Sequence, residues 1–170
     1  MIVEKKRNGK SIIYKPEKAT FSGHYLKLIP NAPNYSPDEN IQKELINILI
    51  IKFPVNEIES HLSNRIEFID PGVNLESIIC NICSKSIDME TWADIMSNWY
   101  KIDNSSLDIQ TPCCNKKSNL NDLIYDSPSG FSKYRLSVNN AEYITENIEK
   151  VRIEIQKKTG IGFKIIWSRY

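Results

Sequence analysis

The chain has 170 residues, of which 22 are lysine or arginine and 21 are aspartate or glutamate, so its formal net charge is +1. This length is typical of one domain, or of one domain with an insertion, and it is sufficient to bury a hydrophobic core. The near-neutral charge argues against a protein that binds DNA or RNA mainly through phosphate contacts, because such proteins carry a marked basic excess.

The N-terminal segment, residues 1–15, predicts a β-hairpin. Asn8-Gly9 lies between the apolar runs Ile2-Val3 and Ile12–Tyr14. Asn-Gly favours the positive φ angles of a type I′ turn, which matches the twist of paired strands. The polar residues 15–22 that follow are expected to form a loop.

A β-α-β unit is predicted next. His24–Ile29 is the expected first strand, and Arg65–Ile69 alternates well enough to be the second. Between them, Ser36 is the expected N-cap of a helix that has Pro37 at its first position and Glu39 closing a capping box. Apolar residues then recur at helical spacing on one face of this helix, at Ile41, Leu45, Ile48 and Leu49.

The C-terminal part of the chain repeats this plan. Phe131–Val138 alternates as a strand does, and Asn139 and Glu142 have the spacing of a capping box for the following helix. Gly160 is expected to end that helix. Its apolar stripe consists of Ile144, Ile148, Val151 and Ile155. A final strand is predicted by the alternation of Phe163, Ile165 and Trp167.

Two β-α-β units therefore flank the middle of the chain. We expect residues 23–72 and 130–170 to form one α+β domain, a ferredoxin-like β-α-β-β-α-β sandwich with its helices on one face of an antiparallel sheet. Two small independent halves are the alternative, but each would bury too little apolar surface. Residues 73–129 then form an insertion between the second and third strands of the sandwich.

The insertion has a small amount of predicted structure of its own. Asp88 is expected to cap a helix, and residues 120–125 to form a single helical turn. Leu107 and Ile109 indicate a short strand. One face of the helix carries Trp92, Ile95, Met96 and Trp99. We interpret these side chains, with Tyr100, as packing residues rather than as a binding stripe.

All four cysteines lie inside the insertion, as Cys80-Asn-Ile-Cys83 and Cys113-Cys114. A Cys-x-x-Cys turn brings two thiolates to a single metal ion, and a second pair can complete the tetrahedral set that zinc takes. The chain has no apolar run long enough for a signal peptide or a membrane span, so we expect a cytoplasmic protein without a membrane partner. Thiols stay reduced there, which favours metal over disulfide. We therefore predict a structural zinc site, in a zinc-ribbon-like insertion, with Cys80, Cys83, Cys113 and Cys114 as ligands.

Two features depart from an ordinary zinc ribbon. The 29 residues between Cys83 and Cys113 are a long spacing, and the second cluster is an adjacent pair. Adjacent cysteines reach one ion only through an unusual turn, so His61, His24 or a carboxylate is an alternative candidate for the fourth ligand. We favour a site in which all four ligands are cysteines. A redox dithiol is a further alternative, but such enzymes place Cys-x-x-Cys at the start of a helix, whereas the helix here is expected only near Asp88.

The function that this site predicts is not catalytic. Four thiolates leave zinc no open position for water or substrate, and the chain has no nucleotide-binding, zinc-protease or deaminase motif. We expect a non-catalytic, zinc-stabilised protein-interaction module with a protein partner, one version being an immunity-type protein that blocks a toxin. The alternative is a nucleic-acid-binding zinc-ribbon protein, and a thiol redox enzyme comes third. Nucleic-acid binding would use the base-stacking candidates Tyr25, Phe131 and Tyr134.

Several short motifs occur between residues 25 and 170. Besides Cys80-x-x-Cys83 they are Phe68-Ile69-Asp70-Pro71-Gly72, Thr111-Pro112-Cys113-Cys114-Asn115, Leu120-Asn121-Asp122-Leu123-x-Tyr125, Gly130-Phe131 and Ile166-Trp167-x-x-Tyr170. Together they resemble a widespread family of uncharacterised bacterial zinc-knuckle proteins. Members of that family tend to have Cys-Pro-x-Cys-Gly and Pro-Cys-Cys-Gly knuckles, where this chain has Asn81, Ser84 and Asn115. The resemblance implies a bacterial, cytosolic zinc protein and no defined activity.

Overall fold

The computed structural model describes residues 2–6, 9–18, 22–102, 106–142 and 145–170. Its elements in chain order are β1 (Ile2–Lys6), β2 (Gly9–Tyr14), β3 (His24–Pro30), α1 (Glu39–Lys52), β4 (Ile58–Ile69), β5 (Ile78–Ile79), β6 (Ser86–Ile87), α2 (Met89–Lys101), β7 (Asp108–Gln110), β8 (Lys117–Asn119), the 3-10 helix η1 (Leu120–Asp122), β9 (Ile124–Tyr125), β10 (Gly130–Asn139), α3 (Thr145–Thr159) and β11 (Phe163–Arg169). Within these ranges, no helix is long and apolar enough to cross a membrane.

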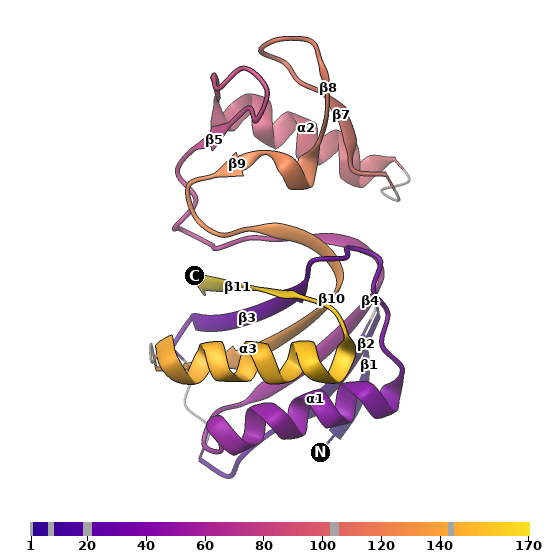
Figure 1. The fold of residues 1–170 in the computed structure, drawn as a ribbon, viewed down its shortest axis with the longest axis vertical. Coiled ribbons are helices and arrows are strands. Elements are labelled where there is room, and N and C mark those ends of the chain that lie inside the picture. The colour runs from indigo at the N-terminus through magenta and orange to yellow at the C-terminus, as the bar shows by residue number, and fades with distance from the viewer. Residues whose placement is uncertain (1, 7–8, 19–21, 103–105, 143–144) are drawn as a thin grey trace.

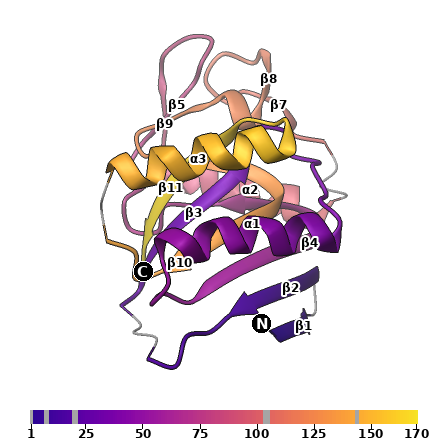
Figure 2. The same ribbon diagram turned by 60° about the horizontal axis from the view of Figure 1, so that its bottom comes forward.

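The main body is an α+β fold built on one large antiparallel sheet. Its six strands lie in the order β1-β2-β4-β10-β3-β11. Helices α1 and α3 lie next to each other over one face of this sheet (Figures 1 and 2). The cysteine-rich segment leaves the sheet after β4 and returns at β10. It contains α2 and two small sheets, β6-β5-β9 and β7-β8, and lies beyond one end of the main sheet (Figure 1).

The main hydrophobic core lies between the large sheet and helices α1 and α3. The helix stripes predicted from the apolar spacing face this core. Their buried members include Leu45, Leu49, Ile148, Val151 and Ile155. They pack on strand residues from the middle of the sheet, among them Leu28, Tyr134, Leu136 and Val138. Burial of each such aliphatic side chain stabilises the fold by about 1.5–3 kcal/mol.

A second core attaches the cysteine-rich segment to the ends of β4 and β10. The ring of Phe68 on β4 lies 5.7 Å from that of Trp92 and 5.0 Å from that of Phe131. Trp99 lies 5.3 Å from Phe131. The Phe68 N–H also donates a hydrogen bond to the Tyr100 hydroxyl at 3.0 Å. The aromatic face of α2 therefore packs inward, as predicted, and does not form a surface stripe.

Helix α1 begins two residues later than predicted. Its N-cap is Asp38, whose side chain accepts a hydrogen bond from the Ile41 N–H at 2.9 Å. Ser36 instead donates to the Asn34 carbonyl at 3.2 Å. Aspartate caps a helix as well as serine does, and its charge interacts favourably with the helix N-terminus, which explains why the later residue is used.

Strand β4 is longer than predicted, with 12 residues instead of the segment Arg65–Ile69. It pairs with β10 in two stretches, which meet at an irregularity between Ser132 and Tyr134 of β10. The even-numbered side chains of β4 pass from one core to the other along the strand, since Leu62 packs against the main core whereas Ile66 lies in the second core. The polar run Ser63-Asn64-Arg65 interrupts the apolar residues in the middle of this strand, so the sequence pattern indicated only its last part.

The start of α3 was also predicted wrongly. Asn139 is still a strand residue paired with β3, so Asn139 and Glu142 do not form the predicted capping box, and α3 begins at Thr145. Ile144, assigned to the apolar stripe of this helix, lies outside the described residues. The predicted N-terminal hairpin is present as the antiparallel pair β1–β2, while Asn8 of its predicted turn again lies outside the described residues.

Candidate metal centre

The first cysteine pair lies on a tight turn between β5 and β6. The Cys80 N–H donates to the Lys85 carbonyl at 2.9 Å, and the Ser84 N–H donates to the Cys80 carbonyl at 3.0 Å. Ser84 has a φ of +60°, in the left-handed region that glycine prefers. The Ile82 N–H donates to the Cys80 sulfur at 3.4 Å. This turn, the first knuckle, holds the sulfurs of Cys80 and Cys83 close together.

The second knuckle, between β7 and β8, repeats the same hydrogen bonds. The Thr111 N–H donates to the Lys116 carbonyl at 2.9 Å, and the Asn115 N–H donates to the Thr111 carbonyl at 2.9 Å. Asn115 has a φ of +58°. Thr111 thus occupies the position that Cys80 has in the first knuckle, and Cys114 that of Cys83. Cys113, one residue before Cys114, supplies the second sulfur, so an ordinary knuckle accommodates an adjacent cysteine pair.

The two knuckles face each other and bring all four sulfurs together. The Sγ atoms of Cys80, Cys83, Cys113 and Cys114 all lie within 4.8 Å of one another, and none of the cysteines is in a disulfide. The Cys80–Cys114 sulfur distance is 3.9 Å and the Cys83–Cys113 distance is 3.3 Å. Sulfurs bound to one tetrahedral zinc at about 2.3 Å lie roughly 3.8 Å apart. The cluster therefore has the size and the donor atoms to hold a metal ion such as zinc.

The protonation of the cluster is unequal between its members. The backbone N–H of Cys83, with that of Ile82, lowers the pKa of the Cys80 thiol to about 6, against the opposing effect of burial. Burial raises the pKa of the Cys113 thiol to about 12, and the neighbouring sulfurs of Cys83 and Cys80 raise it further. Metal binding requires all four thiols to be deprotonated, and such crowded thiolates repel one another. The positive charge of a divalent cation offsets that repulsion.

The alternative fourth ligands are not part of this cluster. His61 lies in β4, where its Nδ1 is 2.8 Å from the Ser11 hydroxyl of β2, and His24 is exposed at the start of β3. Within the described residues the cluster consists of the four cysteines alone. The first knuckle is followed by β6, and α2 begins only at Met89, so Cys83 does not lie at a helix N-terminus as a redox dithiol does.

Beside the knuckles lies a groove that the sequence analysis missed. Its volume is about 650 Å³, and it is lined from both sides by Asn81, Ile82, Asp108, Gln110, Lys117 and Asn119. The Ser118 hydroxyl donates to the Asn81 side chain at 2.7 Å, which joins the two knuckles. No spacing rule connects these residues, since they come from separate turns that become neighbours only in the folded segment.

The predicted base-stacking residues are mostly inaccessible. Phe131 is 1% exposed and Tyr134 is 0% exposed, because each faces one of the two cores. Only Tyr25 keeps part of its surface in solvent. The expectation that Phe131 and Tyr134 offer exposed rings was therefore wrong, and strand alternation alone could not show that each of these rings lies in one of the two cores.

Comparisons of the chain with protein-family models, with curated proteins and with solved structures find no match. The resemblance to bacterial zinc-knuckle proteins therefore rests on the short motifs alone. The chemistry of the site follows from its geometry, which is that of four convergent thiols on two hydrogen-bonded knuckles.

Proposed function

We propose that this protein is a non-catalytic protein-interaction module whose cysteine-rich segment is held in shape by one structural zinc ion. The ligands would be Cys80, Cys83, Cys113 and Cys114. The observation that carries the proposal is the convergence of all four sulfurs within 4.8 Å. A zinc ion with four thiolates has no open position for water or substrate, which supports a structural role over a catalytic one.

The construction of the segment supports a stabilising role for the metal. Strands β5, β6 and β9 have two residues each, and β7 and β8 have three. Strand pairs this short are marginal by themselves in water. Metal binding to preformed ligands adds directly to folding free energy. In the cytoplasm, where we propose that the protein acts, the thiols stay reduced and available for zinc.

The groove beside the knuckles is the surface that we propose for a protein partner. It combines an exposed apolar side chain, Ile82, with the charged residues Asp108 and Lys117 and several amides. Protein interfaces commonly have this mixture of apolar contact and a polar rim. Because Asn81 and Ile82 belong to the first knuckle, bound zinc would fix the shape of the groove. An immunity-type protein that blocks a toxin is one concrete version of such a module.

For the main body, we propose a ferredoxin-like β-α-β-β-α-β sandwich formed by residues 23–72 and 130–170. The element order β3-α1-β4-β10-α3-β11, the antiparallel pairing and the two helices on one face support this assignment. Residues 1–15 would extend the sheet beside β4 as a hairpin. Residues 73–129 would be an insertion between β4 and β10.

The metal proposal is tested by elemental analysis of protein purified under reducing conditions. About one zinc per chain is expected, and cobalt substitution should give the absorption of a tetrahedral sulfur site. The Cys83→Ser variant should lose the metal. Ser97→Ala, a substitution at an exposed position of α2 in the same segment, should keep it. Metal-free wild type with a Cys80–Cys83 disulfide in freshly isolated protein would contradict the proposal.

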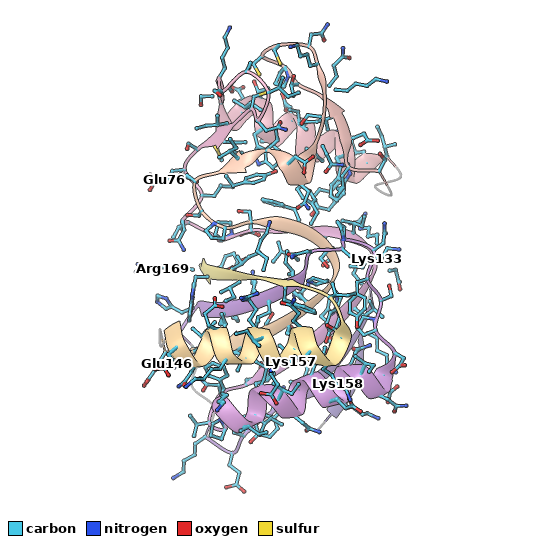
Figure 3. All side chains as sticks on the ribbon, in the orientation of Figure 1. Glu76, Lys133, Glu146, Lys157, Lys158 and Arg169 are labelled. Carbon is cyan, nitrogen blue, oxygen red and sulfur yellow. The ribbon has the colours of Figure 1, made fainter. Side chains whose placement is uncertain are left out.

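The partner proposal is tested by affinity capture from native lysate with wild type and two charge-reversal variants. Lys117→Glu alters the groove, whereas Lys157→Glu alters the outer surface of α3, well away from the cysteine-rich segment (Figure 3). A specific protein partner should be lost with Lys117→Glu and retained with Lys157→Glu. Capture of nucleic acid alone at about 0.15 M salt, where surface charges are screened within about 8 Å, would favour the nucleic-acid alternative instead.

A further inference from the structure

The helix-free face of the main sheet carries a row of polar residues on its central strands. Leu136 and Val138 of β10 point into the main core, so Ser137 between them points to the opposite face. Strand register places Ser137 directly opposite Lys27 of β3 on one side and opposite Glu59 of β4 on the other. A carboxylate, a hydroxyl and an ammonium therefore stand in one row across three adjacent strands.

A cavity of about 250 Å³ opens over this row. The residues that give it its chemistry are Lys27, Glu59, Asp70, Arg135, Ser137 and Tyr170. Drug-sized ligand pockets have about 300–1,000 Å³, so this cavity suits a smaller, polar molecule. It lies on the sheet and shares no residue with the cysteine knuckles or their groove.

Lys27 is a buried cation without a contacting carboxylate. Its side chain is only 9% exposed, and its Nζ donates to the Tyr170 hydroxyl at 2.6 Å and to the Asp70 carbonyl at 3.5 Å. Among the described residues no carboxylate oxygen forms an ion pair with it. Buried charges in proteins are normally paired. Burial lowers the pKa of Lys27 to about 8, with Asp70 opposing and Arg135 reinforcing the shift. The Tyr170 hydroxyl in turn donates to the Asp70 carboxylate at 3.1 Å, so the ammonium reaches a negative charge only through this hydroxyl and contacts no carboxylate directly.

Ser137, opposite Lys27 in the strand register, has no hydrogen-bond partner for its hydroxyl among the described residues. It is 7% exposed and lines the cavity. Two residues further along β10, the buried Asn139 Oδ1 is also without a partner in the described structure. Most buried polar groups in folded proteins are hydrogen-bonded. A carboxylate placed between Lys27 and Ser137 would accept from both groups.

The rest of the cavity favours a ligand that also carries a positive charge. Three carboxylates, Glu59, Glu67 and Asp70, face the two cations Lys27 and Arg135. Two of these carboxylates share the Arg135 guanidinium, whose nitrogens lie 3.0 Å from a Glu67 carboxylate oxygen and 3.9 Å from one of Glu59. The lining thus has one excess negative charge, to which a simple anion would add another. A ligand with an ammonium as well as a carboxylate adds no net charge.

We propose that this cavity binds a small zwitterion, an α-amino acid or a closely related amino carboxylate. Its carboxylate would lie between Lys27 and Ser137, and its ammonium would point toward Glu59. Neighbouring strands are about 4.8 Å apart, so Glu59 and Lys27 stand roughly 10 Å apart at the backbone. The site is independent of the zinc proposal.

The test is calorimetric titration of the full-length zinc-loaded protein with the standard L-amino acids, after a thermal-shift screen of the same panel. Acetate and methylamine serve as probes with a single charge. At least one amino acid should raise the melting temperature and bind at least about tenfold more tightly than either probe, as expected when both charges are recognised. Lys27→Met and Ser137→Ala should each weaken this binding about tenfold or more.

The matched control is Lys164→Met on the same sheet face. Lys164 donates to the Ser129 carbonyl at 2.8 Å and does not line the cavity, so amino-acid affinity should stay unchanged. If Lys27→Met does not fold, the smaller change Ser137→Ala decides the question. Three results would overturn the proposal: no heat or thermal shift with any amino acid, acetate binding as tightly as the best amino acid, or amino-acid binding that survives Ser137→Ala undiminished.

Discussion

Single residues in strained conformations mark the two knuckles. Ser84 and Asn115 both have positive φ, at +60° and +58°, in the fifth position of their turns. Glycine adopts this conformation without steric cost, whereas other residues pay about 1 kcal/mol, and asparagine less than most. The two knuckles therefore form despite a local cost that the rest of the segment offsets.

Replacing Ser84 by glycine should relieve that cost. We expect Ser84→Gly to raise the free energy of unfolding by about 0.5–1 kcal/mol, and Asn115→Gly to raise it less, because asparagine tolerates this region. Urea denaturation of the zinc-loaded protein measures the change. Ser86→Gly in strand β6 is the control and should not stabilise. A loss of stability with Ser84→Gly as large as with Ser86→Gly would show that the strain does not matter.

Lys27 should make stability depend on pH in a defined direction. Its folded pKa of about 8 lies below the ordinary lysine value of 10.5, so the unfolded chain holds this proton more tightly. The cost of burying the ammonium is therefore full below pH 8 and declines as pH rises from 8 toward 10.5. Wild type should gain stability relative to Lys27→Met over this interval.

Urea denaturation of both proteins at several pH values between 7 and 10 checks this prediction. Groups common to the two proteins, including the cysteines, largely cancel in the difference. The charged and titratable groups that face Lys27 are Asp70, Arg135, Glu59, Glu67 and Tyr170. The pKa of Tyr170 is raised to about 12, chiefly by burial, so its hydroxyl stays neutral throughout. If the difference in the free energy of unfolding between wild type and Lys27→Met stays constant with pH, the lowered pKa of Lys27 is contradicted.

At the scale of elements, the two knuckles are equivalent turns with different cysteine positions. Thr111 holds the first position of the second knuckle, and its hydroxyl lies 3.0 Å from the Cys114 sulfur. Cys113 at the third position supplies the sulfur that Cys80 supplies from the first position of the other knuckle. This equivalence explains how adjacent cysteines reach one cluster without an unusual backbone.

The equivalence predicts that a ligand can be moved within the second knuckle. Cys113→Ser should weaken zinc binding strongly, because it leaves three thiolates. The double variant Thr111→Cys with Cys113→Ser should recover much of the affinity by restoring Cys-x-x-Cys geometry. Competition with a zinc chelator measures both affinities, and cobalt spectra report the number of sulfur ligands. A double variant no better than Cys113→Ser would mean that the two turns are not interchangeable.

At the scale of the whole molecule, two cores meet at the ends of β4 and β10. The main core is mostly aliphatic and lies under helices α1 and α3, whereas the second core is richer in aromatic residues and includes the inner face of α2. A structural metal attached to only the second core should stabilise the two regions unequally.

Removal of the metal should therefore loosen residues 73–129 more than the main sheet. Hydrogen exchange after chelation under reducing conditions should show faster exchange in this segment, while β3 and β10 keep their protection. Readdition of zinc should reverse the change. Equal loss of protection in the main sheet would show that the fold depends on the metal as a single unit.

Much of the local structure could be predicted from the sequence. The apolar spacing identified the inward faces of α1, α2 and α3, and Asp88 was correctly predicted as the N-cap of α2. The grouping of the four cysteines was predictable from their pairing along the chain. The length of β4 and the burial of Phe131 and Tyr134 were not, since both depend on what covers each strand face.

The sequence by itself determined the helices, the hairpin and the two cysteine clusters, because these depend on contacts within one or two turns of chain. Only the tertiary structure decided how the clusters meet, that Thr111 replaces a cysteine, and that Glu59, Ser137 and Lys27 form one row. Strand register joins residues that are far apart in the chain. An irregularity such as that of β4 and β10 shifts which residues face each other, and no local spacing records that shift.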